Sequence, residues 1–149
     1  MKETFVLREE DLSGLAFKVA EILLTARTPR AKVILLKGDL GAGKTTFARE
    51  LAEVLGIDKN EVNSPTFVLK KEYNAQHPIF KKLIHVDAYR FNEKSEAKIL
   101  GLDEDLKDES TLIAIEWPNK MPYIEPDLEI VFAVSDDTTR DIALLYEKK

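Results

Sequence analysis

Residues 38–45 read G-D-L-G-A-G-K-T and match every fixed position of the phosphate-binding pattern G-x-x-x-x-G-K-[ST]. Glycines in such a loop let backbone N–H groups approach a polyphosphate more closely than any side chain would allow. Lys44 would place a positive charge on the β- and γ-phosphates, and Thr45 would offer its hydroxyl to Mg²⁺. The motif therefore predicts a nucleotide-binding P-loop.

The residues on either side of the motif have the patterns of a strand and of a helix. Residues 33–36, before it, are all apolar, which is typical of a buried strand. After it, Phe47, Leu51, Val54 and Leu55 follow helical spacing and would form one apolar stripe. In this strand, loop and helix order, the positive N-terminal end of the helix would face the same phosphate anion.

Two further strand-like runs each end in an acid. Residues 111–115 lead into Glu116, and residues 82–86 lead into Asp87. In proteins with a P-loop, an acid that follows a neighbouring strand holds Mg²⁺ directly or through water. Glu116 fits this role and Asp87 competes for it, and residue types alone do not rank them. The alternative for Glu116 is an acid that only faces solvent at a strand end.

Two other polar residues lie close to Asp87 in the sequence. Arg90 could clamp a phosphate or form a structural ion pair. His85 lies inside the expected strand, and we interpret it as a packed strand residue rather than a base.

Residues 63–67 read N-S-P-T-F and follow the expected helix. Pro65 fixes its own φ angle and favours an extended Ser64, so Thr66 would hold a defined place on a loop. This arrangement resembles a GTPase-type switch, in which a loop hydroxyl meets Mg²⁺ and the γ-phosphate. An ordinary turn before a strand is the alternative. Trp117 could pack near the nucleotide or fill the core.

The order of these patterns predicts an α/β fold. Expected strands cover residues 4–7, 32–37, 67–72, 82–87, 112–116, 128–134 and 141–147, and expected helices cover residues 11–26, 44–55 and 94–100. Strands alternate with helices and the last two form a hairpin. We therefore expect a three-layer P-loop NTPase-like domain on a largely parallel sheet with antiparallel additions. Its length suits a single P-loop ATPase domain over residues 1–149.

Composition excludes several other classes of function. The chain has no cysteine, so disulfides, thiolate metal sites and thiol nucleophiles are excluded. Its formal net charge of −5 argues against a protein that binds DNA or RNA through its overall electrostatic potential. The apolar runs fall far short of the roughly 20 residues that span a bilayer, and residues 1–4 lack the apolar core of a signal peptide. We expect a cytoplasmic protein with no membrane or DNA partner.

Together these segments resemble the TsaE (YjeE) family, small bacterial P-loop ATPases required for N6-threonylcarbamoyladenosine (t6A) modification of tRNA. The family motifs are G-D-L-G-A-G-K-T-T, S-P-T-F, H-x-D-x-Y-R and I-E-W. This chain has them, in that order, at residues 38–46, 64–67, 85–90 and 115–117. The resemblance covers nearly the whole chain, including residues 101–103 and the late strand with Arg140. One departure is Asn119, where many relatives have an acid or Gln.

The resemblance implies a role for each site residue. The expected ATP- or ADP-binding residues are Gly41, Ala42, Gly43, Lys44, Thr45, Thr46, Trp117 and Arg140. Thr45 and Glu116 would hold Mg²⁺, and Asp87 would be needed for hydrolysis. Thr66 would belong to the switch, and Trp117 would lie close enough to report bound nucleotide. Lys44, Asp87, Glu116 and Thr66 are thus the expected catalytic residues.

The resemblance also implies a mechanism and partners. ATP and Mg²⁺ would order the loop that carries Thr66, and loss of the γ-phosphate would release it. The partners would be TsaD and TsaB, which modify adenosine 37 of tRNAs that read ANN codons. This chain would promote turnover of the TsaB–TsaD complex and would meet tRNA only indirectly, through that complex.

A small-molecule kinase is the main alternative, because a P-loop on an α/β fold also fits it. Such kinases need a substrate-binding subdomain and usually an arginine-bearing lid. The chain has few arginines and no spare segment between Glu116 and the last strands, which argues against this class. A nucleotide-binding module without hydrolysis is a third possibility, and the paired acids Asp87 and Glu116 disfavour it.

Overall fold

The computed structural model describes residues 1–26, 29–39, 41–62, 70–88, 101–116 and 124–147. Its strands are β1 (Lys2–Arg8), β2 (Lys32–Lys37), β3 (Lys70–Asn74), β4 (Lys82–Asp87), β5 (Thr111–Glu116), β6 (Leu128–Val134) and β7 (Thr139–Tyr146). Its helices are α1 (Leu12–Thr25), α2 (Lys44–Val54) and the short α4 (Leu102–Asp105), with 3-10 turns η1 (Glu9–Asp11) and η2 (Lys59–Glu61).

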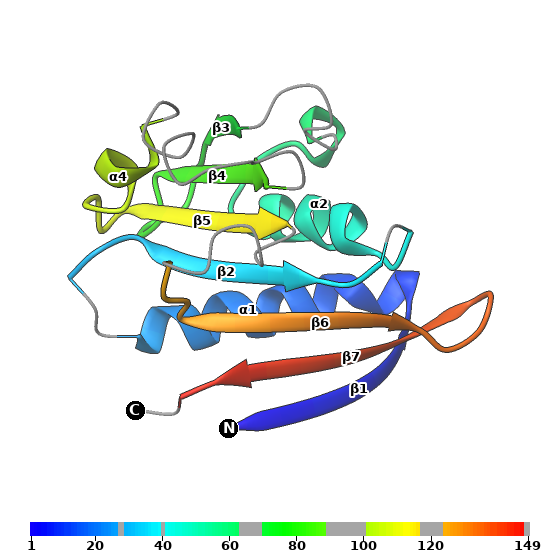
Figure 1. The fold of residues 1–149 in the computed structure, drawn as a ribbon. Helices are drawn as coiled ribbons and strands as arrows, with labels where there is room; N and C mark the ends of the chain where they lie inside the picture. The colour runs from blue at the N-terminus through cyan, green and yellow to red at the C-terminus, as the bar shows by residue number, and fades with distance from the viewer. Residues whose placement is uncertain (27–28, 40, 63–69, 89–100, 117–123, 148–149) are drawn as a thin grey trace.

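The strands form one seven-stranded sheet in the order β1-β7-β6-β2-β5-β4-β3 (Figure 1). β2 pairs in parallel with both β5 and β6, and β4 pairs in parallel with β5. β7 lies antiparallel between β6 and β1, and β3 lies antiparallel to β4. Five strands therefore share one direction and β3 and β7 oppose it. This confirms the predicted α/β fold with a largely parallel sheet and antiparallel additions.

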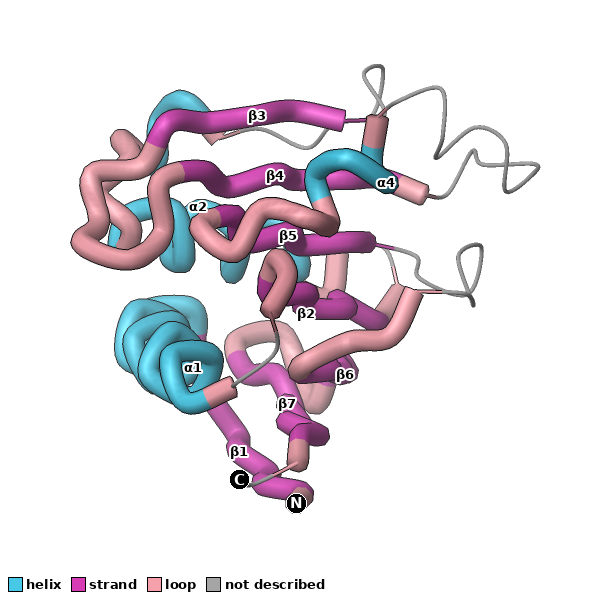
Figure 2. The backbone as a smooth tube through the Cα atoms, turned by 90° about the vertical axis from the view of Figure 1, so that its left-hand side faces the viewer, coloured by secondary structure: helices cyan, strands magenta, loops and turns pink. Residues whose placement is uncertain are grey.

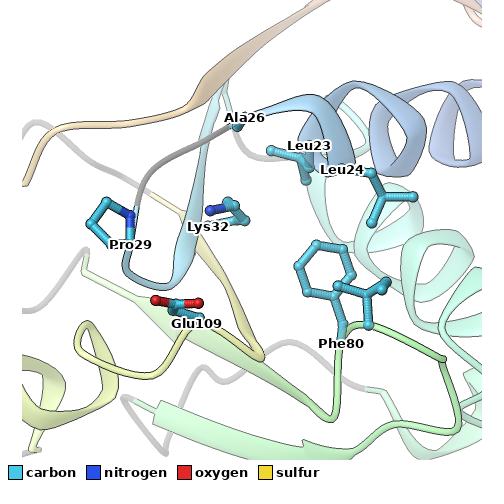
Figure 3. Close-up of a pocket in the computed structure, with 8 residues that line it drawn as sticks. Leu23, Leu24, Ala26, Pro29, Lys32, Phe80 and Glu109 are labelled. Carbon is cyan, nitrogen blue, oxygen red and sulfur yellow. The ribbon is translucent and has the colours of Figure 1, made fainter.

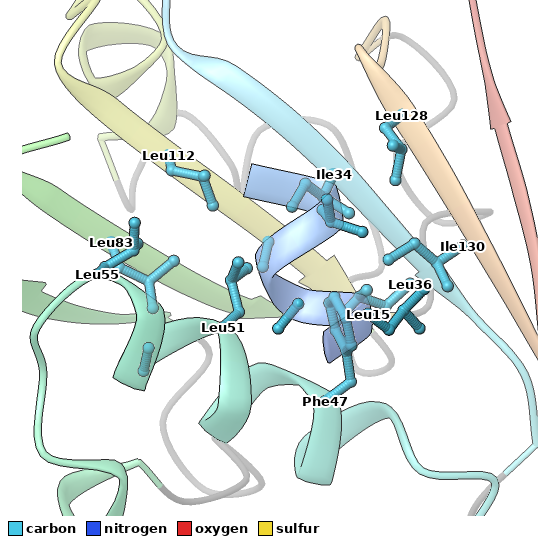
Figure 4. Packing of buried hydrophobic residues seen from close by; sticks show 14 of the residues in the cluster. Leu15, Ile34, Leu36, Phe47, Leu51, Leu55, Leu83, Leu112, Leu128 and Ile130 are labelled. Carbon is cyan, nitrogen blue, oxygen red and sulfur yellow. The ribbon is translucent and has the colours of Figure 1, made fainter. Parts of the chain in front are cut away.

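Helices lie on both faces of this sheet. α1 and α2 cover one face (Figure 2), where Phe47 and Leu51 of α2 pack with Ile34 and Leu36 of β2 (Figure 4). On the other face, Leu102 of α4 belongs to a second apolar cluster that includes alternate residues of β2. Successive side chains of a strand point to opposite faces. The unbroken apolar run in β2 is explained because both of its faces are buried.

Most predicted elements agree closely with the structure. β2, β4 and β6 have the predicted bounds, and α1 differs from the predicted helix by one residue at each end. β3 extends to Asn74, beyond the predicted strand end at residue 72, because its antiparallel pairing with β4 continues to Lys82. The predicted helix at residues 94–100 lies outside the described residues. α4 was not predicted; it is short, and Leu102 anchors it as a buried side chain.

Candidate functional site

The predicted glycine loop joins the end of β2 to the start of α2 (Figure 1). Gly43 has a φ of +108° immediately before the helix, and Lys44 is the first residue of α2. Gly38 passes close to β6: a Cβ atom on it would lie 2.6 Å from the backbone oxygen of Phe132. A side chain at Gly38 would therefore displace the loop or the strand. The strand, glycine loop and helix predicted from the motif are confirmed.

Lys44 is a charged side chain that is almost fully buried, with 4% of its surface exposed. Its Nζ donates a hydrogen bond of 2.7 Å to the carbonyl oxygen of Gly38. Burial lowers the pKa of the Lys44 ammonium, and the nearby carboxylates of Glu116, Asp87 and Asp39 act in the opposite direction. The ammonium therefore lies within the electrostatic reach of both predicted strand-end acids.

Asp87 and Glu116 end neighbouring parallel strands and lie directly opposite each other in the register of β4 and β5. Leu83 of β4 and Leu112 of β5 pack in the apolar cluster on the face that carries α2. Asp87 and Glu116 follow these leucines by an even number of residues, so their side chains point to the same face. Both acids are buried, with 8% and 5% of their surfaces exposed. The structure thus brings Lys44, Asp87 and Glu116 together, as the motifs predict.

His85 is fully buried, which confirms its interpretation as a packed strand residue. Sequence reasoning missed its polar contact: Nε2 lies 2.6 Å from Oε2 of Glu116. The sequence spacing indicated part of this contact, because His85 and Asp87 are two residues apart and so share a face of β4. Finding the partner on β5 needed the strand register as well.

Arg140, the second residue of β7, reaches the glycine loop. Its Nη2 donates to the carbonyl oxygen of Gly41 at 3.4 Å, and its Nη1 donates to the carbonyl oxygens of Asp136 and Thr139. These contacts hold the guanidinium between the β6–β7 turn and the loop. The antiparallel strand β7 therefore contributes a cation beside the P-loop, where the sequence places a nucleotide-binding residue.

The remaining predicted loop residues lie at the start of α2. Thr45 and Thr46 are its second and third residues and are partly exposed, and Ala42 is buried. A further residue, Phe132 of β6, was not predicted. Its ring lies 5.8 Å from the ring of Phe47 between centroids, at 57°, and its side chain lies 3.9 Å from a Cβ placed on Gly43. Phe132 therefore supports the loop from the sheet.

Several predicted residues lie outside the described part of the chain. These are Ser64, Pro65, Thr66, Phe67, Arg90, Trp117 and Asn119. Their predicted roles stay predictions.

The donor set at the site suits a metal that arrives with a phosphate ligand. Within the described ranges, no group of three or more His, Cys, Asp or Glu side chains is placed to hold a metal ion. Mg²⁺ is commonly bound by one or two carboxylates together with waters and substrate phosphates, rather than by a cage of protein ligands alone. The carboxylates of Asp87 and Glu116 and the hydroxyl of Thr45 fit that kind of shared coordination, and the Lys44 ammonium, which can only donate hydrogen bonds, fits the phosphate instead.

A cavity of about 380 Å³ lies at the opposite end of the central strands (Figure 3). Leu23 from α1 lines it together with Lys32, the first residue of β2, and Phe80, which precedes β4. The glycine loop instead follows the last residue of β2. The cavity is therefore separate from the P-loop, and none of the predicted site residues lines it.

The parallel strand, the glycine loop and a helix that begins with a buried lysine beside two strand-end carboxylates define a P-loop α/β protein. Comparison of the sequence with known families then gives the family itself. The model of threonylcarbamoyl adenosine biosynthesis protein TsaE matches residues 8–142, and the chain belongs to this family.

Individual relatives agree with this assignment. The tRNA threonylcarbamoyladenosine biosynthesis protein TsaE of Haemophilus influenzae is 37% identical over 141 residues, which cover 93% of this chain and 86% of that protein. The protein of the same name from Aquifex aeolicus is 34% identical over 149 residues, covering 99% and 98%. The family assignment therefore extends over nearly the full length of both relatives.

The fold has a counterpart among solved structures. The crystal structure of Bacillus subtilis YdiB superposes with a TM-score of 0.66 at 30% sequence identity, covering 97% of this chain and 84% of that chain.

Among the helices that the structure describes, none is long and apolar enough to cross a bilayer.

Proposed function

We propose that this protein is the ATPase of tRNA threonylcarbamoyladenosine biosynthesis, and that it binds Mg·ATP at its P-loop and hydrolyses it as a switch. One observation carries the proposal: buried Lys44 lies at the start of α2, near the strand-end acids Asp87 and Glu116. The names of the relatives from Haemophilus influenzae and Aquifex aeolicus support the pathway. The geometry of the glycine loop supports the proposal that the bound ligand is a nucleotide.

The binding roles follow from the donor chemistry of each residue. Lys44 and the amides of Gly41, Ala42, Gly43, Thr45 and Thr46 bind the phosphates of ATP and ADP. Arg140, which already contacts the loop, and Trp117 complete the nucleotide-binding set. Thr45 and Glu116 hold Mg²⁺, which supplies charge neutralisation at the phosphates.

The local charge supports a bound cation. One ammonium at Lys44 and two carboxylates at Asp87 and Glu116 carry a formal charge of −1 when all three are ionised. A triphosphate adds several negative charges, so Lys44 alone cannot balance them. Asp87, which ends the neighbouring strand β4, positions the attacking water for hydrolysis. Thr66 acts on the switch loop, where it senses the γ-phosphate.

The partners are TsaB and TsaD, and the protein promotes turnover of their complex in the cytoplasm. The net charge of −5 supports indirect contact with tRNA, because an acidic protein gains little from the phosphate backbone. A switch that fired alone would consume ATP without driving the modification cycle. Hydrolysis by the isolated protein is therefore slow and is stimulated by its partners.

Steady-state phosphate release at fixed Mg·ATP tests this proposal, measured with the protein alone, with TsaB, with TsaD and with both. We expect slow release from the protein alone and a clear increase with the partners. Thr66→Ala should lose the increment that depends on the partners. A rate of phosphate release that neither partner changes, but that increases with a small alcohol or nucleoside as acceptor, would contradict the switch and indicate a kinase.

A further inference from the structure

His85 and Glu116 form a buried side-chain pair beside the P-loop lysine. Nε2 of His85 lies 2.6 Å from Oε2 of Glu116, and the exposed fractions of the two residues are 0% and 5%. An ionised carboxylate can only accept hydrogen bonds, so Nε2 is the donor. A short hydrogen bond to a charged acceptor away from water is among the stronger kinds and holds its acceptor in a defined position.

The second ring nitrogen fixes the tautomer of His85. Nδ1 is buried and has no hydrogen-bond partner among the described residues. A proton on Nδ1 would be a buried donor with no acceptor among those residues, which is costly, whereas a lone pair there loses less. The tautomer with its proton on Nε2 satisfies both atoms best. In this form the ring directs its one N–H group at Glu116.

The register of the sheet explains why the Glu116 carboxylate needs a partner. Asp87 lies directly opposite Glu116, and His85 lies diagonally, two residues before Asp87 on the same face of β4. Like charges directly opposite each other on neighbouring strands repel. A donor on the diagonal side engages Oε2, so Oε1 is the carboxylate oxygen that this hydrogen bond does not use.

We infer that His85 is a positioning residue, whose Nε2–H group holds Oε2 of Glu116 so that Oε1 is presented to the Mg²⁺ site. This inference rests on the proposed function, because it takes Glu116 as a metal ligand. His85 does not touch the nucleotide and acts only through Glu116. Hydrogen-bond partners of metal ligands commonly change metal affinity about 10–100-fold when they are removed.

Two variants separate the hydrogen bond from the bulk of the ring. His85→Gln keeps an N–H donor at about the reach of Nε2, and His85→Leu keeps an apolar side chain but removes the donor. The measurement is the affinity for a fluorescent ADP analogue as a function of Mg²⁺ concentration. We expect His85→Leu to raise the half-saturating Mg²⁺ concentration about 10–100-fold. Its affinity in excess EDTA should stay unchanged, and His85→Gln should stay close to the wild type.

A double-mutant cycle shows whether the effect passes through Glu116. In the Glu116→Gln background, His85→Leu should add no further rise in the half-saturating Mg²⁺ concentration, because the contact is already lost. A wild-type response to Mg²⁺ in His85→Leu, or an equal extra loss in the Glu116→Gln background, would overturn the inference alone. A wild-type protein whose nucleotide affinity does not depend on Mg²⁺ would overturn the proposed function and this inference together.

The tautomer provides a test that needs neither nucleotide nor a stable His85 variant. Long-range ¹H–¹⁵N NMR spectra of the wild-type protein report which ring nitrogen carries the proton. The chain has two histidines, so the spectrum of His77→Gln assigns the His85 signals. We expect the proton on Nε2, with signals that shift in Glu116→Gln. A proton on Nδ1 would overturn the inference.

Discussion

Lys44, Asp87 and Glu116 are charged side chains that the fold removes from water. Burial of charged groups costs free energy of folding unless other charges and hydrogen bonds compensate. Mutual attraction between Lys44 and the two acids supplies part of that compensation, as does the His85 hydrogen bond to Glu116. Groups arranged at such a cost are typical of functional sites. These buried charges are the groups that the proposed nucleotide and its Mg²⁺ ion would meet.

The two acids should have separable roles. Glu116→Ala removes a proposed metal ligand, so we expect it to weaken Mg²⁺-dependent nucleotide binding by at least the roughly 10–100-fold expected for loss of the hydrogen-bond partner of that ligand. Asp87→Ala should instead lower the rate of hydrolysis by about 10²-fold or more, with a smaller effect on nucleotide affinity. Titrations of Mg²⁺ and steady-state rates measure both effects.

Glu104 offers a matched control for these variants. It lies in α4, and its ion pair with Lys107 is exposed to solvent. Ion pairs exposed to solvent contribute little to stability. Glu104→Ala should therefore change neither the Mg²⁺-dependent nucleotide affinity nor the rate of hydrolysis. If affinity is lost in Asp87→Ala and kept in Glu116→Ala, the two roles must be exchanged.

At the scale of elements, the connection between β2 and α2 depends on close passage of the loop past β6. Gly38 has a φ of +149°, and a Cβ on it would meet the backbone oxygen of Phe132 at 2.6 Å. Backbone strain and overpacking each cost about 1–3 kcal/mol, so Gly38→Ala should lower the free energy of unfolding by at least about 2 kcal/mol. Urea unfolding of the protein without ligand measures this change.

Gly41 is the control within the same loop. Its φ is also positive, at +80°, but a Cβ there meets nothing within 4 Å. Gly41→Ala should therefore cost only the backbone term, about 1–2 kcal/mol. Equal losses in the two variants would show that the contact with Phe132 does not restrict the loop.

The turn between β6 and β7 gives a pH-dependent contribution to stability. Hydrogen bonds from the backbone N–H of Thr138, then from Thr139, lower the pKa of the Asp136 carboxyl group to about 2. Because the folded-state pKa lies below the ordinary value of 3.8, this stabilisation is present above about pH 4 and is lost as the pH falls through 2.

Asp136→Ala removes both the carboxylate and this dependence. We expect the variant to be less stable than the wild type near neutral pH, and the difference to shrink as the pH falls toward 2. Unfolding free energies of both proteins across this range test the expectation, and an NMR titration of Asp136 reports its pKa directly. A difference that stays constant down to pH 2 would be inconsistent with the hydrogen bonds to Thr138 and Thr139.

Local patterns predicted the elements that position the site, but not all of their contacts. β2 and α2 could be found because an apolar run and a helical stripe flank a recognisable glycine loop. The strand predicted at residues 4–7 covers part of β1, but its pairing with β7 joins segments far apart in the sequence and leaves no local signal. The contact between His85 and Glu116 likewise depends on the register of β4 and β5. α4 is too short for its periodicity to be read.

In the molecule as a whole, the P-loop lies at the opposite end of the strands from the start of β1 and the end of β7 (Figure 1). β1 begins, and β7 ends, at the end of the sheet that lies away from the glycine loop. The two strands pair along their lengths. A purification tag ahead of Met1 is therefore remote from the site. This geometry lets the protein be tested in a complex without a label at the P-loop.

The most direct test of the account is the number of t6A modifications formed per TsaB–TsaD complex in a reconstituted reaction with ATP and tRNA. We expect many modifications per complex with the wild-type protein. With Lys44→Ala the number should fall to the level found without this protein, while circular dichroism shows that the variant is folded. A folded Lys44→Ala variant that supports as many modifications as the wild type would contradict the central claim that nucleotide bound at this P-loop drives turnover.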